Sequence, residues 1–228
     1  MAERPVHEHI RDLSDSLVAL SGTVLRNFLL AIEALQSLDK DKALQVKSAD
    51  GEIDDSEIQL ESQCLSFLAL QQPVAKDLRT IVAIMKINDN LQRIGDLSVH
   101  VAERLPDIGS GLQRTFDFGS MGMKAGEMVK KAVDAFALRD HGLAMQIDEL
   151  EEEIDLMHRV IFKKAMASMK EPDADIDQLI AVLSISRYLE RIADHAVKIA
   201  REVVYLVTGE SARQKDNSYE KLLDSLRN

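Results

Sequence analysis

Aromatic side chains are scarce in this sequence. Only 4% of its 228 residues are aromatic, and tryptophan is absent. Packed β-sheets favour aromatic and β-branched residues, whereas Ala, Leu, Ile, Val and Met dominate the apolar set here, which suits packing of helix on helix. The shortage of aromatics therefore favours an all-α fold.

Cysteine and long apolar runs are also lacking. The single Cys64 has no partner for an intramolecular disulfide, and it lies in a predicted helix, which indicates a buried, unreactive thiol in a reducing compartment. No apolar run approaches the roughly 20 residues of a membrane span, and Met1–Pro5 lacks the apolar segment of a signal peptide. These absences predict a cytoplasmic protein that reaches a membrane only peripherally, through its partners.

Positive charge is in deficit. Twenty-eight Lys and Arg face 39 Asp and Glu, so the formal net charge is −11. This balance disfavours a broad basic surface that could displace counterions from a phosphate backbone. We expect no direct binding of nucleic acid.

One short segment occurs twice. The sequence LQRIGD at 91–96 recurs 98 residues later as LERIAD at 189–194. Apolar residues around both copies keep the same three- and four-residue spacing, which indicates two equivalent amphipathic helices. Upstream, AIEAL at 31–35 recurs 101 residues later as AVDAF at 132–136. The chain therefore contains an internal repeat.

Helical periodicity and turn signals divide each copy of the repeat into three helices. In the first copy we expect helices at about 7–38, 42–70 and 75–105, and the last helix of the second copy at about 176–207. Short connections make neighbouring helices antiparallel. The predicted fold is all-α: two tandem three-helix bundles, or six long antiparallel helices. The predicted boundaries are 7–106 for the first repeat, 113–208 for the second and 209–228 for a polar C-terminal tail.

Small residues mark the fourth predicted helix. Gly119, Gly122 and Gly126 follow one another at three- and four-residue spacing. Glycine lowers helix stability by up to about 1 kcal/mol relative to alanine, so its repeated use needs a reason. We expect these glycines to let another helix approach closely, and we expect Gly209 to end the last helix.

Acidic and amide side chains recur four residues apart at equivalent positions of the repeat. Residues at this spacing share one face of a helix. The pairs are Asp50 with Asp54, Gln92 with Asp96, Glu151 with Asp155, and Glu190 with Asp194. Carboxylates that converge from two helices need protons, basic partners or a metal to balance their charge. A solvated acidic face explains any single pair, but the equivalent positions of all four favour metal binding.

Oxygen donors of this kind suit hard cations such as Mg²⁺, Mn²⁺, Ca²⁺ or oxidised iron better than a structural zinc. His100 and His158 follow two of the acids at helical spacing and could add an imidazole, although a surface histidine is the more common case. The predicted metal ligands are Asp50, Asp54, Asp96, Glu151, Asp155, Glu190 and Asp194.

No catalytic motif of comparable strength is present. The sequence has no phosphate-binding glycine loop, nucleophile elbow or Cys-x-x-Cys pair. A di-metal oxidase of the ferritin type needs two Glu-x-x-His motifs, and only Asp155-x-x-His158 comes close. We therefore predict a protein without catalytic residues. The alternatives are a metal-dependent helical enzyme, a metal-storage protein, or a helical adaptor for a different transporter.

These features resemble the PhoU family of accessory regulators of the high-affinity phosphate transport system. The resemblance covers about 7–207 and rests on the tandem repeat, the two segments at 91–96 and 189–194, Asp77-Leu78-Arg79, and the two Glu-Ile-Asp elements that begin at Glu52 and Glu153. It implies multinuclear metal clusters at the acidic pairs, with iron the usual candidate and manganese, magnesium or zinc as alternatives. Gln92 is an amide where the family usually has a carboxylate, so the resemblance implies a weaker first-half site.

The resemblance also implies a function. Members are non-catalytic cytoplasmic adaptors, often homodimers. They link the ATPase subunit of the phosphate ABC transporter to a sensor histidine kinase. When phosphate is plentiful, such an adaptor holds the kinase in its non-activating state and restrains uptake. The expected role is negative regulation of the phosphate-starvation response.

Overall fold

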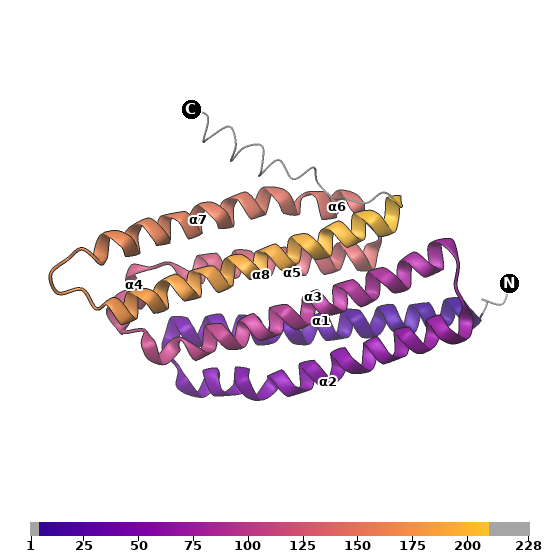
Figure 1. Cartoon of the computed structure of the whole chain (residues 1–228), viewed down its shortest axis with the longest axis horizontal. Helices are drawn as coiled ribbons and strands as arrows, with labels where there is room; N and C mark the ends of the chain where they lie inside the picture. The colour runs from indigo at the N-terminus through magenta and orange to yellow at the C-terminus, as the bar shows by residue number, and fades with distance from the viewer. Residues whose placement is uncertain (1–4, 210–228) are drawn as a thin grey trace, which may run out of the picture.

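The first half of the molecule consists of three long helices that run up, down and up. In the computed structural model, which describes residues 5–209, these are α1 (Pro5–Ser37), α2 (Lys40–Gln71) and α3 (Ala75–Glu103) (Figure 1). Their bounds agree with the ranges expected from periodicity to within a few residues. The predicted polar tail lies outside the described residues, apart from Gly209.

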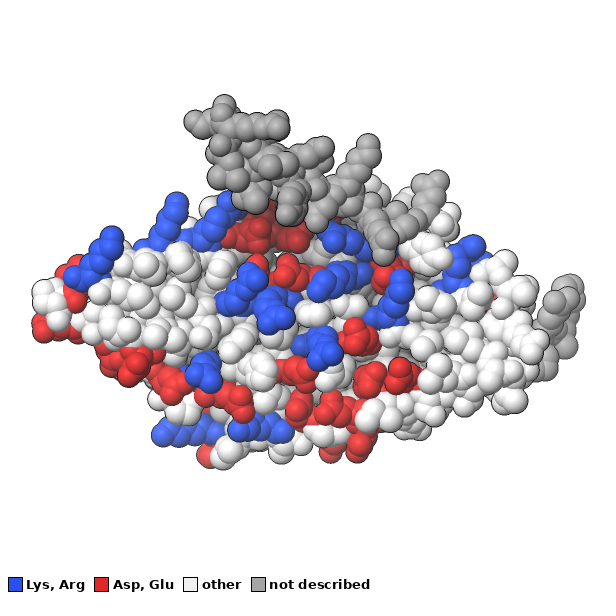
Figure 2. Space-filling view, in the orientation of Figure 1, with Lys and Arg blue, Asp and Glu red and all other residues white. Residues whose placement is uncertain are grey.

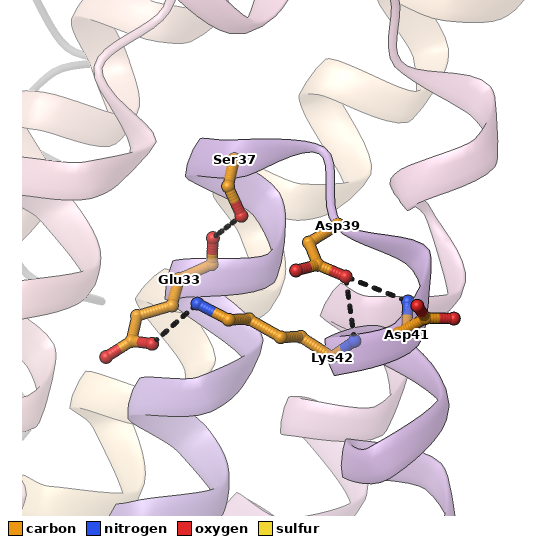
Figure 3. Close-up of polar contacts among 5 residues, drawn as sticks. All are labelled: Glu33, Ser37, Asp39, Asp41 and Lys42. Atoms are coloured by element: carbon orange, nitrogen blue, oxygen red, sulfur yellow. Dashed lines mark hydrogen bonds and ion pairs between the residues drawn. The ribbon is translucent and has the colours of Figure 1, made fainter.

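The turn between α1 and α2 shows how local sequence ends one helix and starts the next (Figure 3). Leu38 takes a left-handed conformation with φ of 54°. The Asp39 carboxylate then caps α2 by accepting hydrogen bonds from the backbone N–H groups of Asp41 (2.9 Å) and Lys42 (3.1 Å). The Lys42 ammonium reaches back to the Glu33 carboxylate at 3.0 Å. Asp140 caps the equivalent helix of the second half in the same way.

The second half repeats this plan with one interruption. It comprises α5 (Phe118–Leu138), α6 (His141–Met145), α7 (Ile147–Ser168) and α8 (Ile176–Thr208). The single helix expected as the counterpart of α2 is therefore divided into α6 and α7. The break is slight, because Gln146 between them keeps right-handed backbone angles (φ −70°, ψ −9°). As expected, Gly209 ends α8: it has φ of 77°, and its N–H donates to the Tyr205 carbonyl at 2.8 Å.

The segment between the halves is not an open linker. Between the end of α3 and the start of α5 the chain forms a 3₁₀ turn, η1 (Leu105–Asp107), and a short helix, α4 (Ser110–Thr115). The Gly109 N–H donates to the Gln178 side chain at 2.9 Å, which ties the segment to the start of α8. Gln113 Nε2 in α4 also donates to the Gln36 carbonyl of α1 at 2.8 Å, so the connection is folded against both halves.

The two halves share one core. α3 packs along α8, and α1 packs along α5, whereas α2 and α7 lie on the outside of the bundle (Figure 1). The glycines of α5 make the α1 contact possible: a Cβ at Gly122 would lie 2.5 Å from Ile32 Cδ1, and one at Gly119 would lie 1.9 Å from Gln36 Nε2. This confirms that they admit a neighbouring helix. Cys64 is buried, as predicted, and burial raises the pKa of its thiol to about 11.

One expectation about apolar runs was wrong. Within residues 5–209, α1 alone is long and apolar enough over Val6–Ser37 to cross a membrane, judged by length and composition. Half of its most apolar 18-residue window is buried inside the fold. Because α2, α3 and α5 all pack on α1, this helix needs apolar residues around most of its circumference, as core helices do.

Candidate functional site

The first acidic cluster lies between α2 and α3 and consists of Asp50, Asp54, Gln92 and Asp96. Gln92 Nε2 donates to Asp96 Oδ1 at 2.9 Å on its own helix and reaches Asp54 Oδ1 on α2 at 3.4 Å. Arg93 also contacts Asp96, with 3.4 Å between NH1 and Oδ2. The structure thus brings together the two first-half pairs identified from the sequence.

Asp50 is the least satisfied member of the first acidic cluster. Its Oδ1 atom is buried without a hydrogen-bond partner. Burial raises the pKa of this carboxyl group, and the negative charges of Asp54 and Asp96 raise it further, against a smaller lowering by His100. His100 itself is exposed and lies 3.5 Å from the Glu103 carboxylate.

The second acidic cluster lies between α7 and α8 and consists of Glu151, Asp155, Glu190 and Asp194. Burial is the main cause that raises the pKa of Glu151, Glu190 and Asp194. Asp155 contributes to all three increases through its negative charge. The four carboxyl groups therefore act on one another electrostatically, as the repeat predicted.

The positively charged side chain of Arg187 borders the second acidic cluster. Arg187 NH1 lies 2.6 Å from Glu190 Oε1, and the Glu190 side chain is only 13% exposed. The other carboxylate oxygen, Oε2, is buried without a partner. The first half has Asp89 at the position equivalent to Arg187. The second cluster therefore has one more carboxylate than the first. It also has two arginines without a cationic equivalent in the first half: the charge of Arg187 opposes the rise in the pKa of Glu190, and that of Arg201 opposes the rise in the pKa of Glu151.

Each cluster continues for one further helical turn through a polar contact that sequence reasoning missed. In the first half, Asn88 Nδ2 donates to the Glu57 side chain at 2.9 Å and to its backbone carbonyl at 3.0 Å. At the equivalent positions of the second half, His158 and Ser186 share a hydrogen bond. Burial, followed by the charge of Arg187, lowers the pKa of His158. The sequence signal that could have revealed these contacts is a polar residue within the apolar stripe, Asn88 or Ser186, four positions before the first member of each pair.

The donor chemistry of both clusters fits a hard cation. The buried, unpartnered oxygens of Asp50 and Glu190 lie one in each cluster, and oxygen donors are what such cations prefer. Among residues 5–209, however, no three His, Cys, Asp or Glu side chains are grouped closely enough to hold a metal ion in their present positions. Figure 2 shows acidic and basic side chains interleaved along the middle of one face, between larger uncharged areas. Metal binding thus stays a prediction.

The fold and the two clusters define a class of protein: an all-helical chain built from a duplicated three-helix unit, with an acidic cluster between two helices of each copy. A family model described as the PhoU domain matches the chain twice, at residues 17–105 and 118–203. The chain belongs to the PhoU family.

Individual relatives agree with this assignment. A Pseudomonas aeruginosa protein called phosphate-specific transport system accessory protein PhoU homolog is 33% identical over 207 residues, covering 90% of this chain and 86% of the relative. A Deinococcus radiodurans homolog of the same name is 32% identical and covers 88% and 95% of the two chains. The crystal structure of the regulatory protein PhoU from Streptococcus pneumoniae superposes with a TM-score of 0.85, at 28% identity, over 91% of this chain and 99% of that one.

Proposed function

We propose that this chain is a non-catalytic accessory regulator of phosphate uptake and a negative regulator of the phosphate-starvation response. The observation that carries the proposal is the match of a PhoU domain to each half, together with relatives named as accessory proteins of the phosphate-specific transport system. The chain covers 86% and 95% of the two relatives described above, so the likeness extends over most of their length.

The partners we propose are the ATPase subunit of the phosphate ABC transporter and a sensor histidine kinase. The protein would work in the cytoplasm, as a homodimer, and would reach the membrane only through these partners. Its acidic surface and long helices offer extended faces for docking, in which charge complementarity selects partners. In phosphate-rich conditions it would hold the kinase in its non-activating state.

Bound cations belong to this proposal. The ligands would be Asp50, Asp54 and Asp96 in the first acidic cluster, and Glu151, Asp155, Glu190 and Asp194 in the second. Iron is the leading candidate, with manganese, magnesium or zinc as alternatives. A bound cation would supply positive charge between the paired helices. The chain's own carboxylates would hold it there and fix the outer helix against the central one.

The regulatory role is tested by deleting the gene in its host. Expression of phosphate-starvation genes should become high in phosphate-rich medium, because the kinase would no longer be restrained. A reporter fused to a starvation promoter measures this, with the intact gene supplied in trans as the control. Full repression in the deletion strain would contradict the proposal.

The metal ligands are tested by elemental analysis of purified protein. An Asp155→Ala, Asp194→Ala double variant should contain less metal than the wild type, because one ligand is lost from each helix of the second acidic cluster. The matched control replaces two exposed acids on the same helices, Glu152→Ala and Asp177→Ala. Equal metal content in all three proteins would show that the acids form only a solvated face.

A further inference from the structure

The seam between the halves, where α3 packs along α8, carries polar side chains on its exposed side. Contacts across the seam fix which residues of the two helices lie opposite each other. They are Lys86 with Glu202 at 3.0 Å, Asn90 with His195 at 2.8 Å, and the rings of His100 and Tyr188, whose centroids are 5.5 Å apart. Rising numbers on α3 meet falling numbers on α8, so the two helices are antiparallel.

Arg93 and Arg191 lie opposite each other on this seam. They are the equivalent arginines of the two repeated segments, at 91–96 and 189–194. Arg93 follows Asn90 by three residues and Arg191 precedes His195 by four, so both share the helix faces whose contacts cross the seam. Both arginines are exposed. The duplication thus brings one arginine from each half to the same place.

A third cation, Lys198, joins the two arginines. It follows His195 by three residues on the same face of α8, and it is exposed. Next to burial, the positive charges of Lys198, Arg191 and Arg93 lower the pKa of the His195 ring, against a rise caused by Asp89. In Figure 2, basic side chains gather in the middle of the face, over α3 and α8. Three cations from both helices therefore lie within electrostatic range of one imidazole.

His195 adds a hydrogen-bond acceptor beside these cations. The Asn90 amide donates through Nδ2 to the Lys86 carbonyl at 2.7 Å, and its Oδ1 atom contacts His195 Nδ1. Because Oδ1 only accepts, Nδ1 carries the proton of the ring and Nε2 keeps a lone pair. Nε2 has no hydrogen-bond partner among residues 5–209 and is not one of the buried unpartnered atoms there, so it reaches solvent.

The neighbouring acids hold these cations only loosely. Arg93 NH1 lies 3.4 Å from Asp96 Oδ2, in a pair whose side chains are 56% and 31% exposed. Lys198 and Arg191 act on Asp194 through their charges, but neither forms a direct ion pair within the described part of the chain. Exposed pairs of this kind contribute little to stability. A multiply charged anion can therefore compete with these carboxylates for the cations.

We propose that Arg93, Arg191 and Lys198 form a binding site for hydrogen phosphate at the seam between the halves. Guanidinium groups bind phosphate oxygens through paired N–H donors, and an ammonium group adds a further charge. At neutral pH phosphate keeps a proton, which His195 Nε2 can accept in a hydrogen bond, whereas sulfate has none to offer. The site deepens the proposed function, on which it rests, because it gives a regulator of phosphate uptake a place for phosphate itself.

Isothermal titration calorimetry with inorganic phosphate tests the site. The protein is first treated with a chelator and dialysed, so that no bound metal can hold the anion. Wild type should bind one phosphate per chain with a Kd below about 1 mM. An Arg93→Gln, Arg191→Gln double variant should bind phosphate at least about tenfold more weakly. The matched control, Arg26→Gln with Arg159→Gln, removes two exposed arginines from α1 and α7 and should stay within about twofold of wild type.

The choice between phosphate and sulfate tests the acceptor. Wild type should bind sulfate at least about fivefold more weakly than phosphate, since a lone pair faces an oxygen without a proton. His195→Leu changes no formal charge at neutral pH, and leucine is the residue of the first half at this position. It should weaken phosphate binding at least about threefold and leave sulfate binding within about twofold. Equal weakening of both anions would overturn the role of His195, and the thermal midpoint of each variant shows that it is folded.

The outcomes separate this site from the proposal on which it rests. No phosphate binding by wild type, or an equal loss in the control pair and in the double arginine variant, would overturn the site. Phosphate binding seen only in metal-loaded protein would also overturn it, because the metal would then hold the anion. Full repression in the deletion strain would overturn the regulatory role, whatever the titrations show. Derepression in that strain, with no phosphate bound by the pure wild type, would overturn the site alone.

Discussion

The two halves of the molecule keep the same apolar plan but balance their charges differently. Lys47 pairs with Glu103 at 3.1 Å in the first half, whereas the equivalent residues of the second half, Asp148 and Arg201, have the opposite signs. Apolar positions of a core are constrained by volume and shape, because interiors are closely packed. A polar pair needs only complementary partners, so the halves can differ there without a change of fold.

The largest expected effect tests whether the two halves unfold together. Leu91 and Leu189 are equivalent residues of α3 and α8, and both are fully buried. Leu91→Ala and Leu189→Ala should each lower the free energy of unfolding by about 2 to 5 kcal/mol, because each leaves a cavity in the shared core. Urea unfolding followed by circular dichroism measures this. Two separate transitions, with only one of them shifted by each variant, would contradict a common core.

The second prediction concerns a histidine that only the second half has. His195 on α8 lies against α3, where its ring and the Asn90 side chain are 2.8 Å apart, and the first half has Leu97 at this position. Burial, followed by the positive charges of Lys198 and Arg191, lowers the pKa of His195 from 6.5 to about 4. The other charged groups that influence the ring are Asp89 and Arg93 on α3.

The sign of the resulting pH dependence follows from proton binding. Between pH 6.5 and 4 the unfolded chain protonates this histidine while the folded one does not, so stability should fall by about 2 to 3 kcal/mol as pH decreases through this range. His195→Leu should reduce that slope in chelated protein, measured by urea unfolding at several pH values. His141→Gln, at an exposed position, serves as the control. An identical slope in His195→Leu would show that the ring titrates normally.

The smallest expected effect concerns an ion pair that crosses between the halves. Lys86 on α3 contacts both carboxylate oxygens of Glu202 on α8, at 3.1 and 3.0 Å. Because the pair lies near the surface, Lys86→Met should cost about 1 kcal/mol or less, and less still at high salt. Lys42→Met removes a comparable pair within the first half. If Lys86→Met lowered the free energy of unfolding much more than Lys42→Met, in a salt-dependent way, ion pairs that cross between the halves would be what holds them together.

The sequence predicted the individual helices better than it predicted which helices pack against one another. Periodicity identifies an apolar face on a helix, but it does not say which other helix covers that face, so the packing of α3 on α8 was not predictable. The interruption at Gln146 also left no clear signal, because the backbone there departs only slightly from a helix. The sequence analysis did not recognise that α1 is long and apolar enough to span a membrane. A helix surrounded by three others is apolar on nearly every side, as a membrane span is.

The candidate site was predictable to the level of its residues but not of its contacts. Spacing of four residues and equivalence within the repeat identified the acidic and amide pairs of both clusters, and led to the expectation that neighbouring helices bring their pairs together. The same reasoning treated Gln92 only as a weakened ligand, because an amide's donors have meaning only once their acceptors are known. Asn88 and Ser186 were missed since small polar residues in an apolar stripe look like ordinary core positions.

The packing of α3 along α8 bears on how the chain must fold. A duplicated unit is often described as two independent domains, each of which folds completely before it contacts the other. Here α3 and α8 cover part of each other's apolar surface, and so do α1 and α5. Joining of the halves is then part of folding rather than docking of finished domains. A chain cut between η1 and α4 would yield two fragments that fold well only in each other's presence.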